Sequence, residues 1–217
     1  MIKAIIFDFN GVIVDDEPLH EKAFRQACFE FDLQLSSGEY LEMCLGRTDR
    51  DGFERVQDKF SLSDVMREKM FQRKSQIYFD FVKKGIYPVV GVIDFINTVK
   101  DKFSIALATA AYRPEVEMIL RELCIRGIFK VIVSAQDVAK SKPDPAPYLL
   151  AAEKLDVLPS ACLVIEDTPS GIASAKGAGM SCIAITTTRN KAELQEADLI
   201  VDNFSQLSHD TVQSFGR

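Results

Sequence analysis

Residues 3–20 read KAIIFDFNGVIVDDEPLH, and the first part of this stretch decides the fold class. After Lys3 the run to Phe7 is apolar without alternation, and Asp8 ends it. Continuous rather than alternating hydrophobicity is typical of a strand that is covered on both faces, as in a parallel sheet. We therefore expect a buried parallel strand with an acidic residue at its carboxyl end.

Five further apolar runs predict the rest of the sheet. They span 104–109, 130–134, 161–165, 181–186 and 198–201. Amphipathic segments follow three of them and predict helices at 113–126, 146–155 and 169–178. Strands that alternate with helices in this way form a doubly wound α/β layout. The expected fold class is thus α/β, with a Rossmann-like parallel sheet as its core.

The interval between the first two predicted strands is too long for a single crossover helix. Within it, His20, Phe24 and Phe31 lie at helical spacing, and residues 65–84 resemble a second, longer helix. Pro88 and other turn residues near it mark the return to the core. The predicted domains are a core formed by 1–14 and 85–217 and an inserted α-helical domain at 15–84.

Composition and charge exclude several classes of partner. The 217 residues carry a formal net charge of -6 without a basic cluster, so neither nucleic acid nor an anionic membrane is expected as a partner. The apolar opening Met1–Phe7 is far shorter than a membrane span or the core of a signal peptide. The five cysteines are widely spaced without a CxxC pair, which is typical of reduced core residues. We expect a monomer in the cytoplasm.

Polar residues with complementary chemistry follow four of the predicted strands. Asp8 follows the first, Thr109 ends the second, Lys142 comes shortly after the third, and Glu166 with Asp167 follows the fourth. Ligands of an open parallel sheet bind beyond the carboxyl ends of its strands, so these side chains would meet at one crevice. They would supply a nucleophile, a donor to phosphate oxygen, a cation and a site for a hard metal ion. Each residue alone could be a turn or surface residue, and only the combination indicates a site.

The reaction that this set predicts is the attack of the Asp8 carboxylate on a phosphoryl group, in which two anions must approach. Mg²⁺ relieves the repulsion, and it prefers a few oxygen ligands while it keeps water and substrate phosphate. Asp8, Asp167 and a backbone carbonyl suit this ion, and Lys142 would neutralise further charge. Thr168 and Pro169 fit the N-cap and first position of a helix. No GxxxxGK(S/T) or GxGxxG motif offers another phosphate site.

Four segments resemble the motifs of the haloacid dehalogenase superfamily. They are FDFNGVIVDDEPLH at 7–20, AT at 108–109, SKPDP at 141–145 and IEDTPSGI at 165–172. Their spacing resembles the β-phosphoglucomutase-like branch, in which a helical cap domain closes over the site. The resemblance implies a magnesium-dependent phosphatase that acts on a small phosphorylated, sugar-like metabolite, with residues 15–84 as the cap domain.

The same resemblance implies a role for each matching residue. Asp8 would form an aspartyl-phosphate with the substrate's phosphoryl group. The residues that would bind this group are Thr109, Ala110 and Lys142. The residues that would serve the metal are Asp8, Asn10 through its backbone carbonyl, Glu166 and Asp167.

Asn10 departs from the family pattern, which has an aspartate two residues after the nucleophile as general acid and base. An amide does not titrate near neutrality, so Asn10 cannot take over this role. Several readings stay open: a leaving group that needs little protonation, a proton from Asp16 or His20, a weakened relative, or an engineered substitution. The Asn10-Gly11 pair is also prone to deamidation, which would regenerate an aspartate.

The inserted domain bears on the substrate. By resemblance, residues 45–50 occupy the family's substrate-specificity loop, and the substrate-binding residues of the cap would be Asp16, His20, Gly46 and Arg47. Arg47 and Arg50 are candidates for a second anionic group, although surface arginines are common. His20 could equally be a packed structural residue.

Differences from the mutase pattern favour a phosphatase. Leu45 and Asp49 stand where the mutase has a lysine and an arginine, and Ala111 with Tyr112 replaces its Ser-Lys pair. A phosphomutase is the nearest alternative, and Asn10 also keeps open a weakly active or non-catalytic protein that binds phosphometabolites. A haloacid dehalogenase needs no metal, which fits Glu166 and Asp167 poorly.

Overall fold

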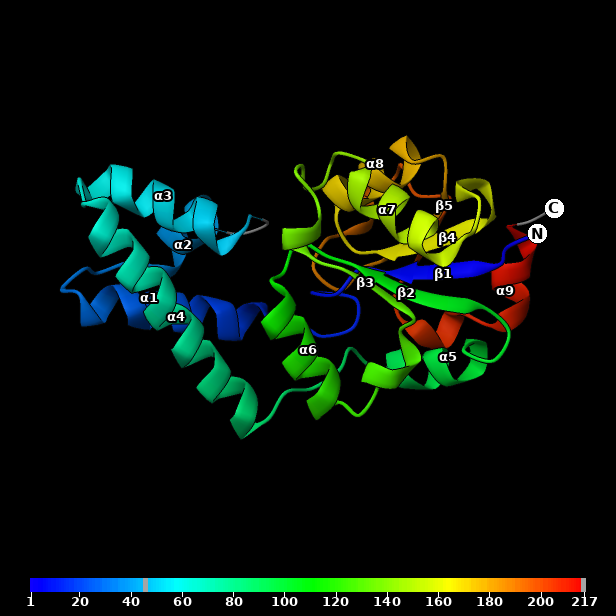
Figure 1. Ribbon diagram of the computed structural model, residues 1–217, viewed down its shortest axis with the longest axis horizontal. Coiled ribbons are helices and arrows are strands. Elements are labelled where there is room, and N and C mark those ends of the chain that lie inside the picture. Colours follow the sequence, from blue (N-terminus) through cyan, green and yellow to red (C-terminus); the bar gives the residue numbers. More distant parts are fainter. Residues whose placement is uncertain (45–46, 216–217) are drawn as a thin grey trace. The chain divides into compact units, whose positions relative to one another are not determined.

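The computed structural model describes residues 1–44 and 47–215, and its chain divides into two compact units. Unit 1 consists of Met1–Asp15 and Tyr87–Arg217, and unit 2 consists of Asp16–Ile86. Unit 1 contains the sheet and unit 2 consists of helices (Figure 1).

Six parallel strands form the sheet of unit 1, in the order β3-β2-β1-β4-β5-β6. All six strands that the sequence predicts are therefore confirmed, with ends that differ by at most one residue. The strands are β1 (Ala4–Phe7), β2 (Ser104–Ala108), β3 (Val131–Val133), β4 (Cys162–Glu166), β5 (Ser181–Ile185) and β6 (Leu199–Val201).

Helices cover both faces of the sheet, as the doubly wound layout predicts (Figure 1). The sequence did not predict α5 or α9, and α6 ends earlier than expected. The helices of unit 1 are α5 (Val92–Val99), α6 (Arg113–Glu122), α7 (Ala146–Leu155), α8 (Pro169–Gly177) and α9 (His209–Ser214).

Alternate residues of β1 show how this strand is buried on both sides. Ala4 and Ile6 belong to the apolar cluster that includes residues of α7 and α8. On the other face, the Phe7 ring centroid lies 6.2 Å from that of Phe95 on α5 and 6.3 Å from that of Phe129. Full burial of such a side chain contributes about 1.5–3 kcal/mol, so the central strand is held firmly. Its carboxyl end is thereby a rigid place for Asp8.

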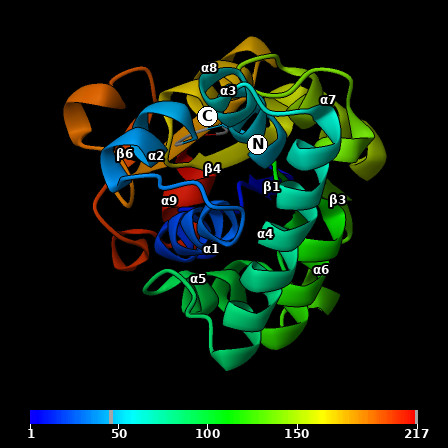
Figure 2. The same cartoon turned by 90° about the vertical axis from the view of Figure 1, so that its left-hand side faces the viewer.

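Within residues 16–44 and 47–86, unit 2 contains four helices, and α1, which Figure 2 shows nearly end-on, packs across α4. A capping box of Ser36 and Glu39 begins α2, and the side chains of Thr48 and Ser63 cap α3 and α4. The sequence predicted helices corresponding to α1 and α4, whereas α2 and α3 were not expected. The helices of unit 2 are α1 (Glu17–Glu30), α2 (Ser37–Met43), α3 (Asp49–Phe60) and α4 (Asp64–Lys84).

The cysteines correct one expectation. All five are free, and four of them are buried, but Cys124 is exposed. It lies just after α6 in a turn, with a φ of 57°, so its side chain is not part of the core.

Candidate active site

A buried lysine joins the ends of two central strands. The Lys142 Nζ lies 2.5 Å from Asp8 Oδ1 and 2.7 Å from Glu166 Oε1. Asp8 follows β1, and its backbone N–H donates to the carbonyl of Ile165 in β4. Asp8, Glu166 and Asp167 are all buried, and each offers a carboxylate oxygen within 4.8 Å of the others. Residues that lie far apart in the sequence thus form one compact acidic cluster around a single ammonium group.

The pKa values show that this cluster lacks positive charge. Burial raises the pKa of Asp8 to about 7, with a further rise from the charge of Glu166, although Lys142 opposes both effects. Burial and the charges of Glu166 and Asp8 also raise the pKa of Asp167 well above its usual range. Two of the three carboxylates therefore resist ionisation while Lys142 is the only cation in contact with the cluster among the described residues. A second cation would make the ionised form favourable.

Glu166 has its acceptor positions occupied. Its Oε1 accepts from Lys142 and, at 2.7 Å, from the Tyr148 hydroxyl. Its Oε2 accepts from the Asp167 N–H at 2.9 Å, and from the Thr168 N–H at 3.1 Å and hydroxyl at 3.0 Å. A Cβ at Gly171 would lie 1.6 Å from Oε1, so only glycine fits there. Glu166 is therefore held as an anchor for Lys142 and for the start of α8.

Asp167 has one occupied and one open carboxylate oxygen. Its Oδ2 accepts from the Thr188 hydroxyl, while its Oδ1 is buried and has no hydrogen-bond partner within residues 1–44 and 47–215. An unpartnered buried carboxylate oxygen is costly, and hard divalent cations prefer such oxygen ligands. The open oxygen, the excess of carboxylates and the raised pKa values fit a site for a magnesium-like ion.

Thr109 and Ala110 lie at the same sheet edge as Asp8. Phe7 of β1 pairs with Leu107 of β2, so the residues that follow both strands emerge together. Thr109 is buried, and its hydroxyl oxygen accepts the Ala111 N–H at 3.0 Å. This bond uses the hydroxyl oxygen as an acceptor and leaves the hydroxyl proton available for donation.

The turn after β1 contains Asn10 and Gly11. Backbone N–H groups of residues 12–14 donate to the carbonyl of Phe9, which folds the chain back immediately after Asp8. Gly11 has a φ of 78°, and a Cβ there would lie 2.0 Å from Asp167 Oδ2. The turn that carries Asn10 therefore packs directly against the acidic cluster.

In unit 2, the structure brings together two of the predicted cap residues. His20 Nε2 lies 3.2 Å from Asp16 Oδ2, and the Tyr78 hydroxyl donates to the same oxygen. On its other side, His20 Nδ1 lies 2.7 Å from Lys74 Nζ. Sequence reasoning missed Lys74, which lies on the buried side of α4.

Two further predicted residues of unit 2, Arg47 and Arg50, make other contacts. Arg47 is exposed, and its backbone N–H donates to the Cys44 carbonyl at 3.0 Å. Arg50 lies 4.0 Å from Glu68 and over the Phe71 ring, in the first turn of α3. Gly46 lies outside the described residues.

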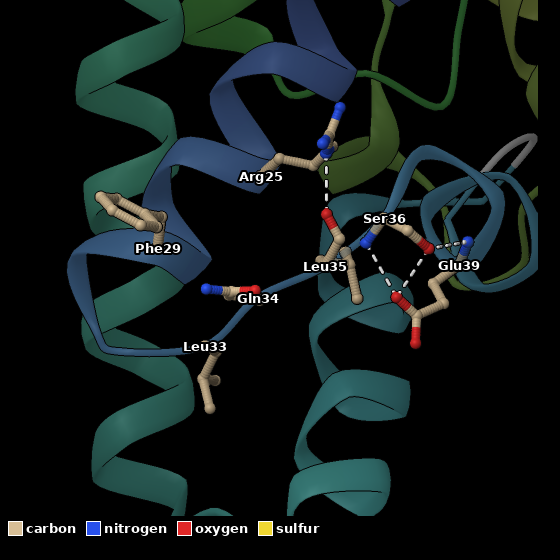
Figure 3. A pocket seen from close by; sticks show the side chains of 7 residues that line it. All are labelled: Arg25, Phe29, Leu33, Gln34, Leu35, Ser36 and Glu39. Atoms are coloured by element: carbon tan, nitrogen blue, oxygen red, sulfur yellow. Dashed lines mark hydrogen bonds between the residues drawn. The ribbon is translucent and has the colours of Figure 1, made fainter.

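A surface pocket of about 550 Å³ also lies in unit 2, between the end of α1 and α2 (Figure 3). Arg25 Nε donates to the Leu35 carbonyl at 2.8 Å, and Ser36 and Glu39 bond to each other (Figure 3). These contacts hold the loop before α2. The pocket contains none of the predicted site residues, so we place the candidate site at the acidic cluster instead. The residues that line it are Arg25, Phe29, Leu33, Gln34, Leu35, Ser36 and Glu39.

The family model of haloacid dehalogenase-like hydrolases matches residues 5–185, which include the whole acidic cluster. The chain belongs to this family. A phosphorylated carbohydrates phosphatase of Thermotoga maritima is 30% identical over 186 residues, which are 84% of this chain and 84% of that protein.

Two solved structures are similar over nearly the whole chain. CbbY from Rhodobacter sphaeroides in complex with phosphate has a TM-score of 0.88 at 28% identity, and the match covers 98% of this chain and 100% of that one. β-Phosphoglucomutase from Clostridium difficile has a TM-score of 0.85 at 27% identity, with 100% and 97% covered. The predicted superfamily, its β-phosphoglucomutase-like branch and the class of phosphoric monoester hydrolase are confirmed. No helix within residues 1–44 and 47–215 is long and apolar enough to cross a membrane.

Proposed function

We propose that this protein is a magnesium-dependent phosphatase of a small phosphorylated, sugar-like metabolite, and that Asp8 forms an aspartyl-phosphate. One observation carries the proposal: three buried carboxylates lie together, two of them contact Lys142, and Asp167 Oδ1 has no hydrogen-bond partner among the described residues. The phosphatase from Thermotoga maritima, which acts on phosphorylated carbohydrates, supports the same substrate class.

Mg²⁺ would be held by Asp8, Asp167 and the backbone carbonyl of Asn10. When bound, it supplies the positive charge that lets two anions approach. Glu166 supports this site without contacting the ion directly, since its hydrogen bonds hold Lys142 and the Asp167 backbone in place. This division of roles explains why one acidic residue has its oxygens occupied while its neighbour keeps one open.

In the first step, an Asp8 carboxylate oxygen forms a bond to phosphorus and the alkoxide of the substrate leaves. Lys142 and the Thr109 hydroxyl, with the backbone N–H of Ala110, hold the phosphoryl oxygens. Water then hydrolyses the aspartyl-phosphate and releases inorganic phosphate. Asn10 cannot donate a proton to the leaving alkoxide. The first step is therefore slow unless Asp16 or His20 supplies that proton.

We further propose that residues 16–86 act as a cap, with His20, Arg47 and the Gly46 loop as its substrate-recognising residues. A phosphomutase is the second candidate, because β-phosphoglucomutase from Clostridium difficile is a structural relative. The two differ in product: a phosphatase releases inorganic phosphate, whereas a mutase returns a phosphorylated isomer. The monomeric state stays a prediction.

The test is phosphate release from p-nitrophenyl phosphate and a panel of hexose phosphates, with Mg²⁺ and with EDTA. We expect release only with Mg²⁺, and Asp8→Ala should lower the rate by about 10⁴-fold or more, as loss of a nucleophile does elsewhere. Asp198→Ala, which removes a charge far along the sheet, is the control and should stay active. Full turnover by Asp8→Ala, or by enzyme without divalent ions, would overturn the mechanism, and isomer formation without phosphate release would indicate a mutase.

A further inference from the structure

Thr188 contacts the acidic cluster from a strand that the predicted site does not include. It follows β5, and its hydroxyl donates to Asp167 Oδ2. The same hydroxyl oxygen lies 3.5 Å from the Asp167 backbone carbonyl, which is a much weaker alternative acceptor. A hydroxyl has one proton, and we assign it to the carboxylate because the backbone carbonyl is too distant to be the better acceptor.

Two neighbours together leave little freedom to the Asp167 carboxylate. A Cβ at Gly11 would lie 2.0 Å from Asp167 Oδ2 and 3.0 Å from Thr188 Cγ2. The Oδ2 atom therefore sits in a slot between the backbone of Gly11 and the side chain of Thr188. The other oxygen, Oδ1, is buried without a hydrogen-bond partner among the described residues. The contacts thus distinguish the two oxygens, and only one is open to a further ligand.

We propose that Thr188 is a positioning residue for Mg²⁺: its hydroxyl fixes Asp167 Oδ2 so that Oδ1 is presented to the ion. This inference rests on the proposed metal site of Asp8 and Asp167. Groups that orient a ligating carboxylate typically change metal affinity by about 10–100-fold when removed. Without the hydroxyl, the Asp167 carboxylate is no longer oriented before Mg²⁺ binds, and binding must supply that ordering. Oδ2 also loses its hydrogen bond.

A purely structural role for Thr188 makes a different prediction. The loop that carries it has other supports, including the capping box of Asn190 and Glu193 directly after it. If Thr188 only supported this loop, its removal would lower stability with or without metal and leave metal affinity unchanged. Mg²⁺ affinity, measured without substrate, separates the two roles.

The experiment compares Mg²⁺ binding to the full chain by isothermal titration calorimetry in four forms. Thr188→Val keeps the shape and removes the hydroxyl, whereas Thr188→Ser keeps the hydroxyl and loses the methyl group. Thr186→Val is the matched control in the same loop, since its hydroxyl lies 3.2 Å from Asp202 rather than at the cluster. Thr188→Ala serves as a second test if the valine variant does not fold. Unfolding in EDTA shows whether each variant is intact.

We expect the dissociation constant for Mg²⁺ to rise by about 10–100-fold in Thr188→Val and to stay within about threefold of wild type in Thr188→Ser and Thr186→Val. The Mg²⁺ concentration for half-maximal phosphatase activity should rise in the same ratio, while kcat at saturating Mg²⁺ changes less. If wild type binds Mg²⁺ and Thr188→Val binds it equally well, or Thr188→Ser is as weak as valine, the role of Thr188 is wrong. If wild type binds no Mg²⁺, the metal site and this inference fail together.

Discussion

Each of the two units of this protein buries one lysine among acidic groups, and the two surroundings differ. In unit 1, Lys142 Nζ contacts Asp8 at 2.5 Å and Glu166 at 2.7 Å, with Asp167 close by. In unit 2, Lys74 Nζ contacts Asp49 at 2.5 Å and the Nδ1 atom of His20 at 2.7 Å. An ammonium can only donate, so Nδ1 accepts and the Nε2–H of His20 faces Asp16.

The pKa values of Asp8 and of the partly buried Asp49 shift in opposite directions. Burial raises the pKa of Asp8 to about 7, because Lys142 is shared with Glu166 and cannot compensate both carboxylates. Burial is the largest single effect on Asp49 as well, but the charge of Lys74, the charge of His20 and the hydrogen bond from Lys74 together hold the pKa of Asp49 below its usual value. In unit 2, the charge of Lys74 is therefore balanced by Asp49. In unit 1, the carboxylates outnumber Lys142, and an external cation can bind them.

The prediction with the largest effect concerns the general acid that Asn10 cannot provide. Asn10→Asp should raise the rate of hexose phosphate hydrolysis by about 10²–10⁴-fold, the usual contribution of general acid–base catalysis. The gain should be smaller on p-nitrophenyl phosphate, whose leaving group needs little protonation. Initial rates of both forms on both substrates test this, after mass spectrometry has excluded deamidation of Asn10.

If Asn10→Asp does not raise the rate, a residue of unit 2 must supply the proton. A wild-type enzyme that is already fast on hexose phosphates, and that Asn10→Asp does not improve, must obtain its proton elsewhere. His20→Asn and Asp16→Asn should then lose the activity that Asn10→Asp fails to raise. In that case Asn10 would be no handicap.

The second prediction removes each buried lysine in turn. Lys142→Met and Lys74→Met should each lower the free energy of unfolding by about 3–5 kcal/mol, because each leaves a buried carboxylate without its partner. Mg²⁺ should restore part of the loss in Lys142→Met, since its site is the same carboxylate cluster. In Lys74→Met, Mg²⁺ should raise the free energy of unfolding only by as much as it does in the wild type.

Chemical denaturation with and without Mg²⁺ measures these differences. Lys176→Met is the control, because the Lys176–Asp198 pair lies at the surface and such pairs contribute only about 0–1 kcal/mol. Equal rescue of both buried-lysine variants by Mg²⁺ would contradict the contrast between the two clusters.

The smallest predicted effect is a pH dependence of Mg²⁺ binding. The pKa of Asp8 is raised to about 7 without metal, so below this pH the folded protein holds a proton that Mg²⁺ must displace. Mg²⁺ affinity should therefore increase with pH by up to about tenfold per unit below 7 and level off above it. The groups that face Asp8 are Lys142, Glu166 and Asp167.

Without metal, the effect of pH on stability runs in the opposite direction to its effect on Mg²⁺ affinity. A raised folded pKa of an aspartate means that the native state binds its proton more tightly than the unfolded chain. This group therefore makes the metal-free protein less stable as pH rises from about 4 to 7. Thermal unfolding at pH 5.5 and 8, with and without Mg²⁺, measures both effects, and Asp8→Asn should remove most of the difference. A Mg²⁺-induced shift in Tm that is equal at both pH values would contradict the prediction.

Much of the fold could be predicted because its strands are buried on both faces. Apolar runs such as that of β1 stand out in the sequence, and all six were found at nearly their final bounds. The helices α2, α3, α5 and α9 were missed; α2, α5 and α9 have eight residues or fewer, which is too short for a periodic pattern to stand out. The capping box of Ser36 and Glu39 is a start signal that the sequence itself carries, and it would have located α2.

The site was predicted in its composition and missed in its supporting contacts. Asp8, Glu166 and Asp167 were expected together and lie together, with Lys142 between the first two. Tyr148 and Thr188 were not expected, although Thr188 lies in the loop that follows β5. A search of every strand end, rather than the first four, would have included it.

Which groups meet could be read from the amino-acid sequence, because all strands of a parallel sheet end on one edge and place their following residues there. What each group can still bind depends on its neighbours in the folded protein. Glu166 has its oxygens occupied by Lys142, Tyr148 and the backbone, whereas Asp167 keeps one oxygen open. Two adjacent carboxylates in one motif thus have different environments, because hydrogen bonds depend on the approach of distant segments that sequence spacing does not specify.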